Sequence, residues 1–353
     1  MEVLDFKTNG WHHFLHCKQR LWDSLAILYT LSSYGIGVRL ILSSNGWLNA
    51  FGVPLLTHSL VLSAYMAHEF MHGNVFPSVR WNVIGGNIML WLNGSCYIRF
   101  QELLQMHIAH HVNRIDYCRF DISGFLKSIP TLLRSLFLGL EWLYIPSLAF
   151  LLRIRLMIAP FQNPDRQQDR LRVILIMLTR GWLFTALAVL SLKAIVLYFL
   201  AYVNMIHILR FMDAFQHTYE SLPMGSLVPN QHRSVSPQQA QSYEQSNTFS
   251  NVISKRYHWL NLLLLNFGYH NAHHRVMKCP WYQLPTLDRV LHSNHHPNYD
   301  SHYITLFELL GNYHRFRTSR IFTGQGEVTN QRGDRQLETF YGAIEVSFLV
   351  VPV

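Results

Sequence analysis

The sequence predicts an all-α integral membrane protein with about four transmembrane helices and a cytoplasmic helical cap. Half of the 353 residues are hydrophobic and 14% are charged, whereas an ordinary soluble domain has roughly 25% charged residues. Apolar stretches of roughly 20 residues, the length that crosses a bilayer, occur in two pairs. The chain also holds 21 histidines, many of them clustered beyond the ends of these stretches. We treat residues 1–353 as a single domain.

The first pair of spans is placed near 22–43 and 48–67. Arg39 is the one charged residue between Asp23 and His68, and the polar turn Ser43-Ser44-Asn45-Gly46 separates the two spans.

The second pair of spans fits about 171–191 and 194–211. Lys193 suits a short exposed turn between them, while Arg180 falls inside a span. We expect Arg180 to snorkel or to face the protein interior. The apolar stretches 81–98 and 125–158 contain glycines or charges, which favours an interfacial or re-entrant placement.

Basic residues lie before residue 22, between 80 and 172, and after 212. The positive-inside rule then places both termini and the segments 68–170 and 212–324 in the cytoplasm. The Ser-, Gln- and Pro-rich stretch 221–250 is predicted to be a loop. No role is assigned to the tail 325–353.

Several classes of function are excluded by composition. The net charge of +9 comes from basic residues that flank apolar segments, which indicates a lipid bilayer and no nucleic-acid partner. The four cysteines form no C-x-x-C pair, which argues against a disulfide framework and a zinc ribbon.

Three histidine boxes carry the predicted chemistry. The first is H-E-F-M-H at the end of the second span, and the second and third share the spacing H-x-x-H-H. On a helix, residues three and four apart lie on one face. The candidate metal ligands in these boxes are His68, His72, His107, His110, His111, His270, His273 and His274.

Eight imidazoles are too many for one ion and suit two. Imidazole binds iron, zinc and copper, but zinc has no redox chemistry. Breaking an unactivated C–H bond with O2 needs a redox metal and two further electrons. The boxes therefore predict a histidine-ligated di-iron site in the cap.

The order and spacing of the boxes resemble the membrane fatty-acid desaturase family over residues from about 22 to 320. The resemblance implies an O2-dependent desaturase that introduces a C=C bond into an acyl chain. It also implies His217 as a ninth metal ligand and Asp213 as a water-mediated partner, and their i, i+4 spacing would put both on one helix face. It does not separate desaturases from related hydroxylases and acetylenases.

The resemblance also implies partners. The acyl substrate is linked to lipid, CoA or a carrier protein. The chain carries no haem, flavin or iron–sulfur motif, so a ferredoxin or a small cytochrome is the expected electron donor, docking on the basic cytoplasmic face.

Two other classes compete with this interpretation. His68–His72 also satisfies the zinc-protease motif H-E-x-x-H, with Glu69 as general base and Asn163-Pro164-Asp165 as a faint second motif. The extra boxes argue against one zinc, and Glu69 is then a neighbour of the ligands or a helix-surface residue. A histidine-rich metal transporter would instead spread its ligands through the spans.

Other histidines compete with the boxes or lie apart from them. His292-Ser-Asn-His295-His296 repeats the box spacing, but Pro297 follows it and no apolar helix precedes it, so we expect it not to bind metal. His58 and His207 are expected to pack or form hydrogen bonds within spans.

Overall fold

The chain is described by a computed structural model. It describes 20–292, apart from 119, 121, 214–215, 218, 220, 224–226 and 229–235, together with 310, 313–314, 326–329 and 335–338. His12, His13 and His16 near the N-terminus lie outside the described residues. So do His295 and His296 and the side chain of His292, in the stretch 292–296 that we call the fourth histidine cluster.

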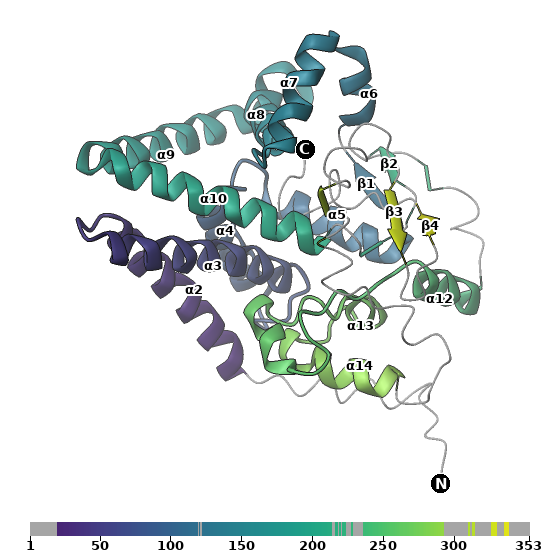
Figure 1. Ribbon diagram of the computed structural model, residues 1–353. Coiled ribbons are helices and arrows are strands. Elements are labelled where there is room, and N and C mark those ends of the chain that lie inside the picture. The colour runs from purple at the N-terminus through teal and green to yellow at the C-terminus, as the bar shows by residue number, and fades with distance from the viewer. Residues whose placement is uncertain are drawn as a thin grey trace.

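Two long helical hairpins form one side of the molecule (Figure 1). One contains α2 (Arg20–Ile41) and α3 (Gly46–Met71). The other contains α9 (Arg170–Leu190), preceded by the short helix η1 (Pro164–Asp169), and α10 (Leu192–Asp213). Within the described part, four helical segments are long and apolar enough to cross a membrane, with η1 and α9 counted as one. The four predicted spans are therefore confirmed as such helices.

The tips of the two hairpins are joined by polar contacts. The side chain of Asn49 donates hydrogen bonds to the carbonyls of Leu40 and Ser43, which closes the α2–α3 turn. Lys193 lies in the α9–α10 turn, and its Nζ donates to Ser43 O at 2.5 Å and to Asn49 Oδ1 at 2.6 Å. The predicted turn residue Lys193 thus ties one hairpin to the other.

Small residues let α2 and α3 approach closely. A Cβ on Gly37 would lie 2.9 Å from the Cβ of Leu56, and a Cβ on Gly52 would lie 2.8 Å from that of Leu40. Close approach at small residues is a common device in membrane helix pairs. α3 also packs against α4 and α10, which makes it the central helix of the bundle.

The rest of the described chain forms a mostly helical cap at the other end of the hairpins (Figure 1). Its longer helices are α4 (Val79–Asn93), α5 (Phe100–Asn113), α6 (Ile122–Ser128), α7 (Thr131–Trp142), α8 (Ser147–Gln162), α12 (Pro237–Ser246), α13 (His270–Arg275) and α14 (Leu284–His292). The 3-10 helices η2 (His258–Leu264) and η3 (Trp281–Gln283) flank α13. Two strand pairs complete it, β1 (Asp116–Cys118) parallel to β2 (Ser221–Pro223) and β3 (Gly326–Thr329) antiparallel to β4 (Arg335–Glu338).

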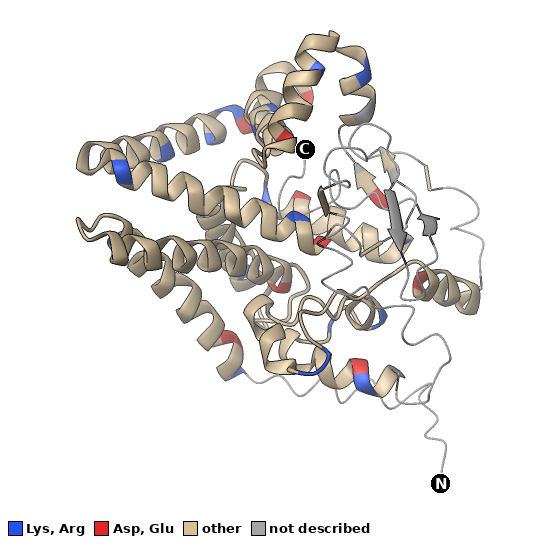
Figure 2. Ribbon diagram, in the orientation of Figure 1, with Lys and Arg blue, Asp and Glu red and all other residues tan. Residues whose placement is uncertain are grey.

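Charged residues on the hairpins lie mostly near the helix ends, and those of the cap are spread over its helices and loops (Figure 2). The stretch 81–98 forms the helix α4 and the turn after it, and α4 is too short to span a bilayer. The stretch 125–158 contains α7 and α8, which meet at a bend of 115° and can be read as a broken span or a re-entrant segment.

One prediction about the cap is wrong. The stretch 221–250 is not all loop, because Pro237–Ser246 form α12. A capping box starts this helix, in which Ser236 Oγ accepts from Gln239 N and the Gln239 side chain accepts from Ser236 N. The Ser-x-x-Gln pattern was a usable signal, but the polar composition around it is typical of a loop.

Candidate metal centre

The first histidine box lies where α3 ends. His72 is the C-cap residue of α3, and its N–H donates to the carbonyl of His68. The helical geometry therefore continues through both residues, as their spacing predicts. Both side chains are buried, and their Nε2 atoms lie 3.2 Å apart.

The second box lies on α5, with all three imidazoles buried. His107 Nε2 is 2.7 Å from His72 Nε2, and His111 Nε2 is 3.1 Å from His107 Nε2. His110 contacts the third box instead, because its Nε2 lies 3.3 Å from His274 Nε2. Two histidines of α5 therefore extend the pair of the first box to a row of four imidazoles: His68, His72, His107 and His111.

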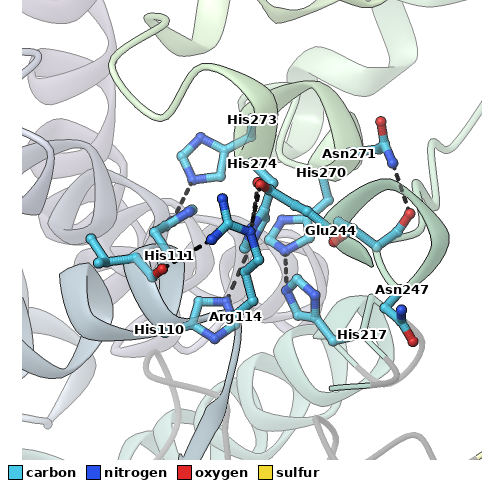
Figure 3. A network of polar contacts seen from close by, with 12 residues as sticks. His110, His111, Arg114, His217, Glu244, Asn247, His270, Asn271, His273 and His274 are labelled. Carbon is cyan, nitrogen blue, oxygen red and sulfur yellow. Dashed lines mark hydrogen bonds and ion pairs between the residues drawn. The ribbon is translucent and has the colours of Figure 1, made fainter. Parts of the chain in front are cut away.

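The third box lies on the short helix α13. His273 Nε2 is 3.2 Å from His111 Nε2, and His274 Nε2 is 3.3 Å from His110 Nε2. His270 Nε2 is 2.7 Å from the Nε2 of His217, the ninth predicted ligand, which lies outside the three boxes. The nine predicted ligands are thus brought together from four segments of the chain. Figure 3 shows six of them: His110, His111, His217, His270, His273 and His274.

The nine imidazoles divide into two groups. The ligand atoms of the five-histidine group lie within 4.8 Å of one another, and the group comprises His68, His72, His107, His111 and His273. Three atoms of the four-histidine group meet the same limit, those of His110, His217 and His274, and His270 joins them through its contact with His217.

Neighbouring residues on two helices are split between the groups. His110 and His111 on α5 belong to different groups, as do His273 and His274 on α13. Successive residues on a helix point about 100° apart, so each helix serves two adjacent positions. The rings of His111 and His274 lie 4.1 Å apart, centroid to centroid. The arrangement therefore fits two ions side by side.

His217 reaches the centre by a different route from the one predicted. α10 ends at Asp213, and His217 forms an antiparallel β-bridge with Thr248. The expectation that Asp213 and His217 share a helix face is therefore wrong. Asn271 fixes this segment against α13, because its Nδ2 donates to Thr248 O at 2.8 Å. Asp213 is buried, and its water-mediated role stays a prediction.

Carboxylates face the outer ring nitrogens. Asp116, on β1, is fully buried, and its Oδ1 lies 3.0 Å from His110 Nδ1. Glu69 Oε1 lies 3.5 Å from His68 Nδ1, and Glu244 Oε1 lies 3.7 Å from His274 Nδ1. Metal-ligating histidines usually present their second nitrogen to such a group, which fixes the ring and its tautomer.

Substituting Asp116 by asparagine is expected to lower turnover about 10- to 100-fold while the protein still folds. The amide keeps the shape of the side chain but removes the negative charge facing His110 Nδ1. Turnover and bound metal would be measured together. The matched control is Asp165→Asn, because Asp165 is exposed at the start of η1. Unchanged turnover in Asp116→Asn would contradict the orienting role.

Glu244, on α12, has two roles at the edge of the centre. Its Oε2 accepts from Arg114 Nε at 3.1 Å, which links α12 to the residue that ends α5 (Figure 3). Burial raises the pKa of Glu244, and the nearby Arg114 guanidinium opposes that rise. Sequence reasoning missed Asp116 and Glu244, since neither belongs to a box or a spaced motif.

The imidazoles of the cap are held in the neutral form that binds metal. Burial lowers the pKa of His273 from 6.5 to about 3, with repulsion from His110 as the second cause. Burial, and then neighbouring imidazoles, lower well below 6.5 the pKa values of His72, His107, His111, His217, His270 and His274. Nine converging imidazoles with their Nε2 atoms inward therefore fit two divalent ions such as iron.

The geometry disfavours the protease interpretation. Glu69 is buried beside the ligand His68, so of its two predicted placements the one next to the ligands holds and the one on the helix surface does not. Its Oε2 accepts from Asn74 Nδ2 at 3.1 Å and Trp281 N at 3.4 Å, and it faces the outer nitrogen of His68. A general base would have to face the metal-bound water instead. Asn163 serves as a local cap, because its side chain accepts from Asp165 N.

His58 and His207 form hydrogen bonds, as predicted. The ring nitrogens of His58 contact Tyr29 OH at 2.8 Å and Leu263 O at 2.9 Å. Those of His207 contact Tyr144 O at 2.8 Å and Tyr313 OH at 3.2 Å. Both residues lie in candidate spans and outside the two histidine groups.

Four membrane-type helices and a buried histidine cluster define a class of candidate membrane metalloproteins. The family model "Fatty acid desaturase" matches residues 45–308. The chain therefore belongs to the fatty acid desaturase family, which uses iron and acts in fatty acid metabolism. A search of curated proteins returns no match.

Proposed function

We propose that the chain is an O2-dependent fatty-acyl desaturase that forms a C=C bond in an acyl chain at a di-iron centre. The observation that carries the proposal is the division of nine buried imidazoles into two adjacent groups. A one-zinc enzyme needs three or four ligands, so five plus four imidazoles support a two-ion centre. Hydroxylation or acetylene formation on the same centre is the alternative.

The overall reaction balances with one O2 and two external electrons. A –CH2–CH2– unit loses two hydrogens, and with O2, two electrons and two protons it yields –CH=CH– and two waters. The five-histidine group and the four-histidine group would each hold one iron, and the two irons would supply the oxidising chemistry. An acyl substrate linked to lipid, CoA or a carrier protein fits the family, as does a ferredoxin or small cytochrome donor.

The residues of this chain hold the centre in place and keep water out. Ile115 O lies 3.1 Å from His110 Nδ1 and would fix that ring, and the carboxylates of Asp116 and Glu244 lie close to the Nδ1 atoms of His110 and His274, where their charge would act on the rings. The rings of Tyr65 and Phe267 pack against each other with their centroids 4.4 Å apart, and Phe267 also contacts the ring of His68. This apolar wall suits a methylene chain, whose carbons are almost alike chemically. We infer that the choice of bond comes from position alone.

The proposed topology follows from charge. Both termini, the histidine centre and the segments 68–170 and 212–324 lie on the cytoplasmic side. The basic residues of the cap support this placement (Figure 2).

The test is metal analysis of the purified protein with lipid analysis of cells that express it. We expect about two irons per chain and an unsaturated acyl product whose double-bond position can be read by mass spectrometry. A hydroxylated product would move the assignment to the alternative. About one zinc, with no iron after expression in iron-supplemented medium, would overturn the proposal.

A further inference from the structure

Two arginines lie among the helices and outside the two histidine groups; Arg153 is buried and Arg180 is half-buried. Arg153 is on α8 and only 8% exposed; its Nη1 donates to Gly94 O at 2.8 Å. Arg180 is on α9, and its Nη1 donates to Trp91 O at 2.8 Å. Arg180 was predicted either to snorkel or to face the protein interior, and its contact with Trp91 O on α4 agrees with the second of these placements.

Phenols and a thiol surround the two guanidinium groups. Arg153 lies over the ring of Tyr202, 5.1 Å from its centroid. The groups that interact electrostatically with Arg180 include the thiol of Cys96 and the hydroxyls of Tyr198 and Tyr202. We call Arg153, Arg180, Cys96, Tyr198 and Tyr202 the arginine cluster.

The cluster has no carboxylate. Among the described residues, neither Arg153 nor Arg180 forms an ion pair, whereas Arg210 pairs with Glu141 at 3.0 Å and Arg172 with Asp169 at 3.3 Å. An unpaired buried charge costs several kcal/mol. Charges within membrane segments normally face a partner or a functional site.

Arg153 presents a complete binding edge. Its Nε and Nη2 atoms are buried and have no hydrogen-bond partner in the described part of the chain. These two nitrogens lie on the same edge of the guanidinium plane, and that edge binds a carboxylate or phosphate through two parallel N–H···O bonds. The third nitrogen, Nη1, is already held by Gly94 O.

We propose that the arginine cluster binds the oxyanion headgroup, a carboxylate or a phosphate, of an amphipathic lipid. The location favours a lipid over a soluble anion, because α9 and α10 are candidate membrane spans. Apolar side chains on these helices are exposed, including Leu183 (50%) and Phe199 (53%). A lipid chain could lie against such a surface while its headgroup meets the arginines.

The cluster is separate from the histidine centre. None of its five residues belongs to either histidine group, and Tyr202 lies about 16 Å along α10 from the end of that helix at Asp213. Lipid binding at the cluster can therefore be measured without turnover, and the proposal does not depend on the iron chemistry.

The experiment measures lipid binding to the full-length, delipidated protein in neutral detergent. Thermal-shift titrations would use oleic acid and phosphatidic acid as anionic probes, with methyl oleate and diacylglycerol as their uncharged counterparts. The variants are Arg153→Gln and Arg180→Gln. The matched control is Arg39→Gln, because Arg39 is an exposed arginine on α2.

We expect at least one anionic lipid to bind and its uncharged counterpart not to. Arg153→Gln should weaken that binding about tenfold to a hundredfold, since it removes the charged bidentate edge, while Arg39→Gln should bind as the unsubstituted protein does. Tighter binding of oleic acid would identify a fatty acid carboxylate as the ligand. Tighter binding of phosphatidic acid would identify a phospholipid.

Equal binding of charged and uncharged lipids, or unchanged affinity in both glutamine variants, would overturn the proposal. Gel filtration and bound metal would show that each variant is folded. Should Arg153→Gln fail to fold, Arg153→Lys serves in its place, because lysine keeps the charge but lacks the bidentate edge. Its affinity is then expected to fall about tenfold, and an unchanged affinity would count against the proposal.

Discussion

Replacing His273 by alanine is expected to abolish desaturation and to remove iron from the protein. His273 supplies α13's ligand to the five-histidine group, and its Nε2 lies 3.2 Å from that of His111. Alanine leaves that group with four imidazoles from α3 and α5 and breaks its link to α13. Turnover should fall below detection, and bound iron should drop from about two to about one per chain or less.

A second substitution separates the two groups. His110→Ala removes a ligand of the four-histidine group while His111, its neighbour, still serves the other group. Both variants should therefore lose turnover, each by damaging a different ion position. Retained activity in either variant would remove that residue from the ligand set.

The matched controls are histidines outside the two groups. His58 lies on α3 like His68 but contacts Tyr29 and Leu263, so His58→Ala should keep its iron. His295→Ala tests the fourth cluster, which lies outside the described residues, and should also keep iron and turnover. Loss of both in His295→Ala would make the fourth cluster a true metal box.

Replacing Arg210 by methionine is expected to destabilise the fold by about 3–5 kcal/mol. Arg210 Nη1 lies 3.0 Å from Glu141 Oε2, and the side chains are 4% and 0% exposed. The pair joins α10 to α7. Glu141 also accepts from Leu148 N at 2.9 Å. Methionine fills a similar volume but leaves the carboxylate buried without its cation.

The measurement is unfolding in mixed micelles of increasing denaturing detergent. The double variant Arg210→Met with Glu141→Leu should recover most of the loss, because no charge is then buried alone. Arg166→Ala is the control, since the Arg166–Glu102 pair is partly exposed and should be worth about 1 kcal/mol or less. Equal losses in Arg210→Met and Arg166→Ala would contradict the assigned role of the buried pair.

Local spacing was enough to predict the spans and the boxes. His68 and His72, four residues apart, are held on one helical face at the end of α3. The spans were recognisable because a bilayer fixes their length and apolar character. His217 was found by resemblance alone, and the β-bridge that positions it depends on Thr248, a distant residue with no local signal.

Contacts between distant segments could not be predicted from the spacing of residues in the sequence. Asp116 and Glu244 are single carboxylates whose meeting with His110 and His274 depends on how β1 and α12 pack. Likewise, Arg153 and Arg180 lie on two different helices, and no sequence pattern in α8 or α9 predicts that the two arginines lie close together. The buried position of Glu69 required knowledge of where Asn74 and Trp281 lie.

The placement of α13 has a consequence for biosynthesis. His273 belongs to one group and His274 to the other, so both ion positions stay incomplete until residue 274 has been synthesised. The first box lies about 200 residues earlier, and contacts between such distant segments form late in folding. We therefore expect metal loading to follow translation. A chain that stops before residue 270 would insert both helical hairpins and lack three of the imidazoles that fill the two positions, those of His270, His273 and His274.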